Sequence, residues 1–348
     1  MDKKITSKQV ADVGEFGLIK LLTEGLSYDA QTIVGVGDDC AVYEVSKGHY
    51  LLATCDMLID GVHFSRKTAS PFLIGCKALA CSLSDIAAMG GRPLFALISL
   101  GLPETTAEEF AQDLYVGIRS MCRDYHVSLV GGDTVRSPER VVIDVSMIGD
   151  CPKGKYVLRS GAKPGDAIVV TGYLGSSAAG LEIVSGKQSE SDAERRSELI
   201  EAHLAPEPRC AHGVFLVENF EIHSMMDVSD GLAGDLGHIC EQSKLGARIH
   251  ADKIPISETL KAFCDSAALN PLKYALAGGE DYELLFTLAP AELERLTSRW
   301  PDMFEIPLTH IGEMDANIKG IHIISAGRRE RPLDAQSYEH FRKSRERE

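Results

Sequence analysis

The segment that decides the fold is PFLIGCKALACSLSDIAAMGGRPLFALISLGLP, residues 71–103. Its first part, residues 71–89, carries a helical pattern that starts at a proline and ends at Gly90-Gly91, so it predicts one long helix. Residues 94–102 form a short apolar run closed by Pro103, which is typical of a strand. A long helix that leads into a buried strand indicates a protein that mixes helices and sheets.

The same alternation continues on both sides of this segment. Residues 50–56 form an extended run, and Thr106 and Glu109 fit a capping box that would introduce a second helix. The apolar face of that helix is expected to comprise Phe110, Leu114, Ile118, Met121 and Tyr125. Two further strands, near residues 128–130 and 141–148, complete the first half of the chain.

Proline, glycine and lysine cluster at residues 150–155, which predicts a domain boundary there. We therefore expect an N-terminal domain over residues 1–150 and a C-terminal domain over residues 151–348. The second half restarts with a strand at residues 167–171, and the polar stretch 186–198 is expected to be an exposed excursion. The predicted fold class is α/β (α+β), with a mixed-sheet N-terminal domain and an α/β C-terminal domain.

Composition excludes several classes of protein. The 348 residues are 44% hydrophobic and 25% charged, and 51 acidic against 36 basic residues give a formal net charge of −15. This balance argues against a nucleic-acid or membrane partner, because either would need a basic face. No signal-peptide pattern opens the chain, and the apolar run 94–102 is too short to span a bilayer, so we expect a cytoplasmic protein.

The nine cysteines are odd in number, and no two of them show C-x-x-C spacing. We therefore expect reduced, mostly buried thiols rather than a disulfide framework or a zinc site.

Common nucleotide-binding signatures are incomplete in this chain. GVGDDC at residues 35–40 begins like a dinucleotide loop, but Cys40 stands where the third glycine is needed. Gly186-Lys187 begins like the end of a P-loop, but Gln188 replaces the required Ser or Thr. The sequence also lacks H-E-x-x-H, G-x-S-x-G and the kinase H-R-D motif. If ATP binds to this chain, a different design holds it.

Acidic residues recur at strand ends and glycine turns. These residues are Asp38, Asp39, Asp56, Asp85, Asp133, Asp227, Asp230, Glu280 and Asp281. Because carboxylates repel phosphates, such a set is suited to phosphate chemistry only if cations lie between them, and Mg²⁺ is the natural candidate. Each position alone also has an ordinary explanation: Ser229 or Asp230 as a helix N-cap, Gly-Asp pairs as turns, and Asp85 as a solvated residue.

The sequences around these acids belong to a series of motifs that runs in order along nearly the whole chain. The motifs are GEFGLI (14–19), GVGDDCAV (35–42), DMLIDGVHF (56–64), KALACSLSDIAAMGGRP (77–93), LVGGDT (129–134), LRSGAKPGD (158–166), DVSDGLAGDLGHI (227–239), LAGGEDYELLF (276–286) and YEHF (338–341). This series resembles the thiamine-monophosphate kinases, a family in the wider superfamily of aminoimidazole ribonucleotide synthetase and selenophosphate synthetase.

The resemblance implies a homodimer with a β-barrel at its interface, and a site for ATP and several Mg²⁺ ions between the two domains. The implied metal ligands are Asp39, Thr54, Cys55, Asp56, Asp85, Asp133, Asp227 and Asp230. Cys55 stands where the family often has Thr, so the side-chain oxygen ligand is missing and the contact with the metal would come from the backbone. ATP would contact Tyr115, Gly132, Asp133, Arg159 and Ser229. Thiamine phosphate would lie among His63, Glu280 and Tyr338.

The implied reaction is direct in-line transfer of the ATP γ-phosphate to thiamine phosphate, with Asp56, Asp133, Asp230 and Arg159 as the catalytic set. The acceptor is an ionised phosphate oxygen, so no strong general base is expected. Two alternatives stay open: another ATP-dependent enzyme of the superfamily, and a non-catalytic nucleotide-binding module. Without the resemblance, Tyr115 also fits a packed helix face, and His63 also fits a structural histidine.

Overall fold

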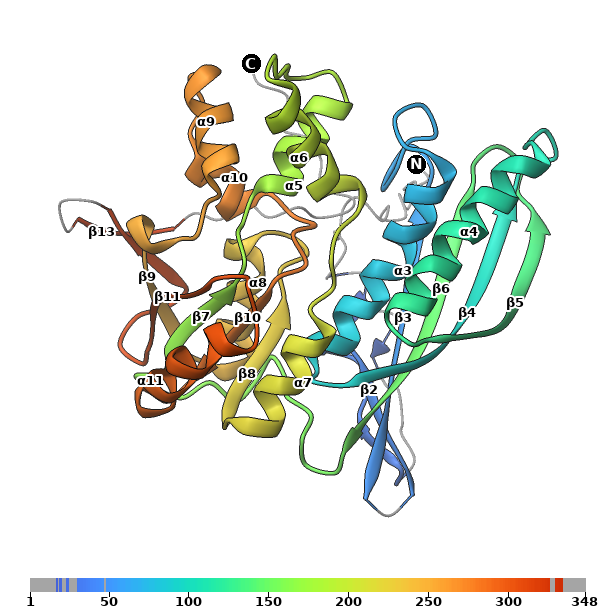
Figure 1. Cartoon of the computed structure of the whole chain (residues 1–348). Helices are drawn as coiled ribbons and strands as arrows, with labels where there is room; N and C mark the ends of the chain where they lie inside the picture. The colour runs from blue at the N-terminus through green and yellow to red at the C-terminus, as the bar shows by residue number, and fades with distance from the viewer. Residues whose placement is uncertain are drawn as a thin grey trace, which may run out of the picture.

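The computed structural model describes residues 17, 19–20, 23–24, 30–46, 48–325 and 329–333. Two β-sheets lie in two halves of the molecule, and helix α3 (Pro71–Ala88) lies where the halves meet (Figure 1). Side chains of α3 reach across this junction: Ser84 donates a hydrogen bond to Asp227, and Lys77 pairs with Glu280. The helix identified first from sequence is therefore the element that joins the two halves.

The first sheet has six strands in the order β1-β2-β3-β6-β4-β5. Their bounds are β1 Thr32–Val34, β2 Ala41–Ser46, β3 His49–Ile59, β6 Val142–Pro152, β4 Arg92–Leu102 and β5 Ser128–Arg136. Strands β4 and β5 run parallel, and the other neighbours are antiparallel. Helices α3 and α4 (Glu108–Asp124) lie along one face of this sheet (Figure 1).

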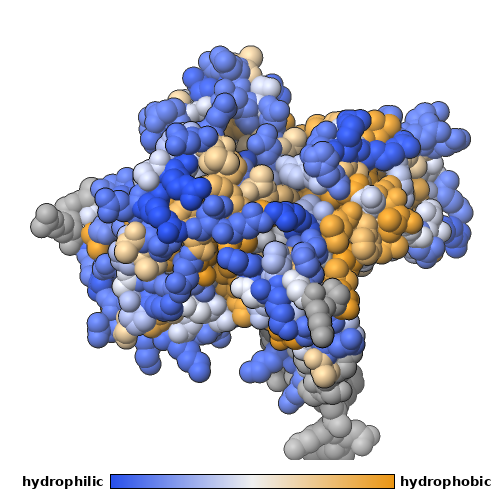
Figure 2. Space-filling model, turned by 60° about the horizontal axis from the view of Figure 1, so that its bottom comes forward, coloured by the Kyte–Doolittle hydropathy of each residue, from blue (hydrophilic) through white to orange (hydrophobic). Residues whose placement is uncertain are grey.

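The two faces of the first sheet differ in burial. Along β6 buried and half-buried residues alternate strictly, and Ile143, Val145 and Met147 of the inner face are fully buried. Met57 and Leu97 pair with the outer residues Asp144 and Ser146, and both are exposed. Figure 2 shows hydrophobic surface gathered on this half of the molecule. The outer face of this sheet thus exposes apolar side chains to solvent, which is typical of a surface that binds a partner.

The second sheet has seven strands in the order β13-β12-β9-β11-β7-β10-β8. Their bounds are β13 Glu330–Pro332, β12 Ile321–Ile324, β9 Gly246–His250, β11 Leu308–Asp315, β7 Ala167–Thr171, β10 Leu284–Leu288 and β8 Ile222–Asp227. Only the pair β9–β12 is parallel among these described strands. All residues of β7 and β10 are buried, as expected for central strands covered on both faces.

Helices surround the second sheet (Figure 1). Their bounds are α5 Ser176–Val184, α6 Ala193–Leu204, α7 Cys210–Asn219, α8 Leu232–Ser243, α9 Glu258–Ser266, α10 Pro271–Ala277 and α11 Pro290–Arg299, with short 3₁₀ turns at Ala251–Lys253 and Trp300–Asp302. With the two sheets, they confirm the predicted mixed α/β class.

Helix α3 has the local features that its sequence predicts. Ser70 caps it by accepting the backbone N–H of Leu73 at 3.3 Å, and Pro71 occupies its first turn. Among the described helices α3 alone is long and apolar enough to cross a membrane, but 72% of that window is buried inside the protein. Its apolar character is therefore accounted for by the core between the two halves.

Two local predictions are wrong. Thr106 does not cap α4, because the helix begins at Glu108 after Ala107, and the Thr106 hydroxyl is buried without a partner among the described residues. The stretch 186–198 is not wholly an excursion, because α6 begins at Ala193 and Asp192 caps it through the N–H of Arg195. The thiol prediction is confirmed: all nine cysteines are free, and only Cys55 is exposed.

Candidate active site

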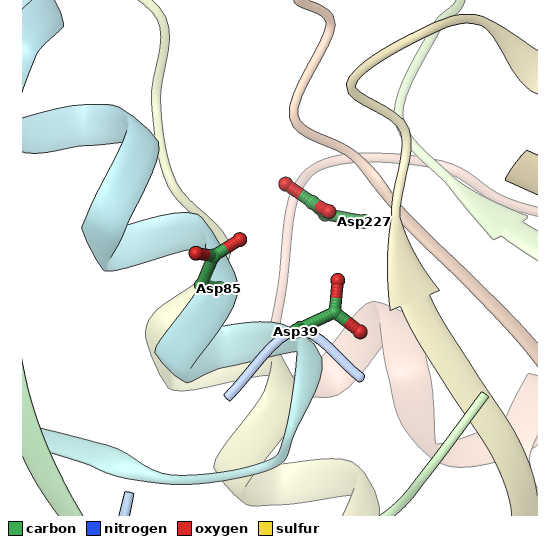
Figure 3. Close-up of side chains that lie close together, drawn as sticks. All are labelled: Asp39, Asp85 and Asp227. Atoms are coloured by element: carbon green, nitrogen blue, oxygen red, sulfur yellow. The ribbon is translucent and has the colours of Figure 1, made fainter. Parts of the chain in front are cut away.

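Three carboxylates meet at the junction of the two halves (Figure 3). Asp39 comes from the loop before β2, Asp85 from α3 and Asp227 from the end of β8. One carboxylate oxygen of each lies within 4.8 Å of the others. We call Asp39, Asp85 and Asp227 the aspartate cluster. Three segments far apart in sequence thus converge on one point, between the two halves, where the family resemblance implied a metal site.

Hydroxyl groups orient the carboxylates of the site. Thr54 on β3 donates to Asp85, and Ser84 donates to Asp227 at 2.6 Å. Ser82 donates to Asp56 at 2.6 Å. Because Ser82 and Ser84 are on the same helix, α3 fixes one carboxylate of each half. A carboxylate that accepts such a bond keeps its remaining lone pairs for another ligand.

Burial and mutual repulsion raise the pKa values of these carboxyls. Burial, with Asp39 nearby, raises the pKa of Asp227 to about 7. Burial, then the charges of Asp56 and Asp227, raise the pKa of Asp85 well above its usual value, and burial also raises the pKa of Asp56. Acids this close need a cation to stay ionised together. Their hard oxygen donors at this spacing fit Mg²⁺, the ion expected from the sequence.

Arg159 joins the loop before β7 to the loop before β2. Its guanidinium contacts both oxygens of Asp39, at 3.1 and 2.9 Å, and its backbone N–H points at Asp38 at 3.1 Å. Burial, together with the charge of Asp39, raises the pKa of Asp38 to about 7. Arg159 therefore holds the Asp39 carboxylate in place within the cluster, and its guanidinium adds one positive charge to a strongly acidic region.

A cavity of about 570 Å³ is lined in part by residues that follow Asp227 in the chain. It is lined by residues from both halves, including His63, Leu181, Ser229, Asp230, Lys273, Tyr274, Glu280 and Tyr282. Ser229 and Asp230 stand two and three positions after the cluster residue Asp227 in the chain. His63 accepts the backbone N–H of Ile59 at 3.0 Å, so its ring is held at the end of β3. The volume suits a small organic molecule.

The loop at residues 278–282 forms one wall of this cavity. The backbone N–H groups of Glu280 and Tyr282 donate to the carbonyls of Ser229 and Val228 at 2.8 and 2.9 Å. Glu280 and Tyr282 both adopt left-handed conformations, with φ of 64° and 52°. Such conformations are costly for residues other than glycine and cluster at functional sites. They also explain why β10 begins only at Leu284, after this loop.

Other predicted site residues lie apart from the cluster. Gly132 and Asp133 are on the edge strand β5, three strand spacings or roughly 14 Å from β3 across the sheet. The thiol of Cys55 is on the outer face and donates to Asp144 at 3.3 Å. Tyr115 is half-buried on α4 against the N-terminal core. Tyr338 lies outside the described residues. The roles of all these residues stay predictions.

Sequence reasoning missed several residues that organise the site. Ser82 and Ser84 lie inside the motif at residues 77–93, but the sequence assigned neither of them a role. Lys77 is 1% exposed in the apolar run of α3, and a charge inside such a run is the signal that a buried partner exists. That signal was available in the sequence, but the identity of the partner was not.

Comparison with known families agrees with this arrangement. Residues 37–151 match the AIR synthase related protein N-terminal domain, and residues 163–324 match the AIR synthase related protein C-terminal domain. The fold and the acidic junction therefore define a two-domain protein of the AIR synthase related class.

Individual relatives narrow this class. The chain is 37% identical over 331 residues to a thiamine-monophosphate kinase of Bacillus subtilis (strain 168), covering 94% of this chain and 99% of the relative. It is 38% identical over 332 residues to that of Escherichia coli (strain K12), covering 94% and 98%. The solved structure described as AaThiL complexed with AMPPCP and TMP superposes with a TM-score of 0.84 at 34% identity, covering 96% and 99%. The chain belongs to the thiamine-monophosphate kinase family.

Proposed function

We propose that this protein is a kinase that transfers the γ-phosphate of ATP to thiamine phosphate, forming thiamine diphosphate and ADP. One observation carries the proposal: Ser229, Asp230 and Glu280 line a cavity, and Ser229 and Asp230 stand two and three positions after Asp227 of the aspartate cluster. A site for cations therefore adjoins a site of the size of a small organic substrate. The family relation supports ATP as the co-substrate, because the solved relative is a complex with AMPPCP and TMP.

The chemistry requires positioning more than proton transfer. The acceptor is a phosphate oxygen that is already ionised near neutral pH, so the main barrier is repulsion between two anions. Arg159 and the carboxylates that hold Mg²⁺ would align the two phosphates for in-line transfer without a phosphoenzyme. Bound there, Mg²⁺ would neutralise the charge of the transferring phosphoryl group.

We assign the remaining roles on the same basis. The proposed Mg²⁺ ligands, for several ions, are Asp39, Thr54, the backbone of Cys55, Asp56, Asp85, Asp133, Asp227 and Asp230. ATP would contact Tyr115, Gly132, Asp133, Arg159 and Ser229. Thiamine phosphate would contact His63, Glu280 and Tyr338. The catalytic set would be Asp56, Asp133, Asp230 and Arg159.

We also propose a homodimer, a cytoplasmic location, and a division into domains at residues 1–150 and 151–348. The exposed apolar side chains on the outer face of the first sheet support the dimer, since such a face is stabilised when a second copy covers it. The net charge of −15 supports a protein without nucleic-acid or membrane partners.

The test is an assay of the purified protein with thiamine phosphate, ATP and Mg²⁺, with products separated by chromatography. We expect thiamine diphosphate and ADP in equal amounts. Asp56→Asn and Asp230→Asn should lower kcat/KM by about 100-fold or more, because charge stabilisation at the transferring group is lost. Asp252→Asn, at an exposed aspartate outside the site, is the matched control.

Three other results would contradict this proposal in distinct ways. ADP formed only with another acceptor would place the protein elsewhere in the superfamily. ATP binding without turnover on any acceptor would indicate a non-catalytic nucleotide-binding module. Full activity in Asp56→Asn and Asp230→Asn would remove these two carboxylates from the site.

A further inference from the structure

Lys77 is an unusual residue for its position. Its long side chain is fully buried, with the residue 1% exposed within the apolar helix α3. Burial of an ammonium group is costly unless each of its donors finds a partner. A buried lysine therefore forms hydrogen bonds or ion pairs with specific acceptors, and the identity of those acceptors indicates its role.

Three groups surround the Lys77 ammonium. Both carboxylate oxygens of Glu280 lie at 2.9 Å, and the backbone carbonyl of His63 lies at 3.2 Å. The third is Nε2 of His203 at 3.5 Å. The three N–H donors of the ammonium match these three acceptors. Glu280 and His63 both line the cavity, so a single buried cation is bonded to two of its walls, one from each half of the molecule.

His203 completes the arrangement from the other side. Burial, and then the charge of Lys77, lower the pKa of His203 to about 4, so its imidazole is neutral near pH 7. With Nε2 accepting from Lys77, Nδ1 carries the proton and faces Glu280 at 3.3 Å and Ser177 at 3.2 Å. Two donors, Lys77 and His203, therefore hold the Glu280 carboxylate from behind.

The front of Glu280 is free to meet a ligand. Its side chain is 27% exposed while that of Lys77 is 2% exposed, and it lines the cavity. Its backbone is held in the left-handed region by the hydrogen bond to Ser229. Backbone and carboxylate are thus both fixed, which is the arrangement expected of a group that recognises a substrate in one orientation.

We propose that Lys77 is a positioning residue: through its ion pair it holds the Glu280 carboxylate toward the thiamine portion of the substrate, whose cationic ring and amino group suit a carboxylate. This inference rests on the proposed function of the cavity. The partners of the Lys77 ammonium are His63, His203 and Glu280 and not the aspartate cluster, so its effect concerns the organic substrate and not ATP.

Steady-state kinetics with Lys77→Met tests this role, because methionine keeps the length of the side chain and removes the ammonium. We expect the KM for thiamine phosphate to rise about tenfold or more, the effect of losing a charge-assisted hydrogen bond, and the KM for ATP to stay within about twofold. The control is His223→Leu, which deprives another buried carboxylate, Asp166, of its partner at 2.7 Å. It should lower Tm but leave both KM values unchanged.

A double-mutant cycle shows whether Lys77 acts through Glu280. Glu280→Gln alone should raise the KM for thiamine phosphate, and adding Lys77→Met should raise it no further. The double variant carries no unpaired buried charge, so it should fold even if Lys77→Met alone does not.

Several outcomes would overturn the inference. These are an unchanged KM for thiamine phosphate in Lys77→Met, an equal rise in both KM values, or full additivity in the double variant. Wild-type protein that makes no thiamine diphosphate would overturn the proposed function itself, which the same assay reports separately.

Discussion

Gly132 occupies a position that no other residue can fill without moving the backbone. Its φ is 156°, and a Cβ atom there would lie 1.9 Å from the carbonyl oxygen of Ile98 on the neighbouring strand. We expect Gly132→Ala to destabilise the protein by about 2–4 kcal/mol, measured by denaturant unfolding. Gly131→Ala is the matched control, because its Cβ would meet only Leu97 Cδ2 at 3.8 Å. Equal stability of both variants would contradict the close approach of β4 and β5.

Asp227 should make the stability of the metal-free protein depend on pH. Its pKa is raised by burial to about 7 in the folded chain, against about 3.9 when unfolded. Between these values the folded protein keeps a proton that the unfolded chain releases, so stability falls as pH rises and the loss is complete above pH 7. In EDTA we expect Tm to fall by about 3–6 °C between pH 5 and pH 8 through this group.

Thermal unfolding of Asp227→Asn isolates the contribution of this carboxyl. The amide cannot ionise, so the variant should show a smaller decrease in Tm over the same pH range. Mg²⁺ at pH 8 should raise the Tm of the wild type more than that of the variant, since binding to the folded state alone is stabilising. Identical pH profiles for the two proteins would rule out Asp227 as the source.

At the level of residues, the sequence identified the acids but not what holds them. Asp39, Asp85 and Asp227 stand out because their flanking motifs are specific, and the structure brings all three together. Ser84 and Lys77 bond to partners 143 and 203 positions away in the chain. No local pattern encodes a contact at such a separation, so these partners required the tertiary structure.

Helices α3 and α4 approach each other closely through two glycines. A Cβ on Gly75 would lie 2.1 Å from the Leu114 carbonyl, and one on Gly117 would lie 2.0 Å from the Phe72 carbonyl. Gly117→Ala should therefore destabilise the protein by about 1–3 kcal/mol, although alanine favours helices. Separation of the helices would also move α3, which carries Asp85. Chemical denaturation and the apparent affinity for Mg²⁺ measure the two effects.

Gly237→Ala is the control for this pair of helices. Gly237 is inside α8, and a Cβ there would meet nothing within 4 Å. The same substitution should stabilise the protein by about 0.5–1 kcal/mol, because only the helix preference remains. If both variants were stabilised, the glycines between α3 and α4 would not be needed for close packing.

Elements were predictable where their signals are local. Helix α3 and strand β7 have self-contained patterns, and the structure places them at Pro71–Ala88 and Ala167–Thr171. The start of α4 was misjudged because the N–H of Thr106 bonds to the Pro103 carbonyl in a preceding turn. The start of α6 was missed because polar composition hides a capped helix whose buried residues, such as Leu199, come later.

The order of strands in the first sheet could not be deduced from the sequence. Strand β6 inserts between β3 and β4, so the last strand of this half pairs with two earlier ones. Strand patterns show which residues face inward but not which strands are neighbours. The position of Asp133 on the edge strand β5, away from the aspartate cluster, depends on this order. Which of the predicted site residues lie close together in one chain could therefore be read only from the complete fold.

The oligomeric state is the last prediction and concerns the outer face of the first sheet. Met57 on this face is 54% exposed, and Met303 in the second half is 56% exposed. If a second copy covers the sheet, Met57→Glu would bury a charge at the interface and should convert the dimer to a monomer. Met303→Glu introduces the same charge at a site of nearly equal exposure and should leave the mass of the dimer in solution unchanged. Analytical ultracentrifugation distinguishes the two, and a wild-type monomer, or a dimer in Met57→Glu, would exclude this face as the interface.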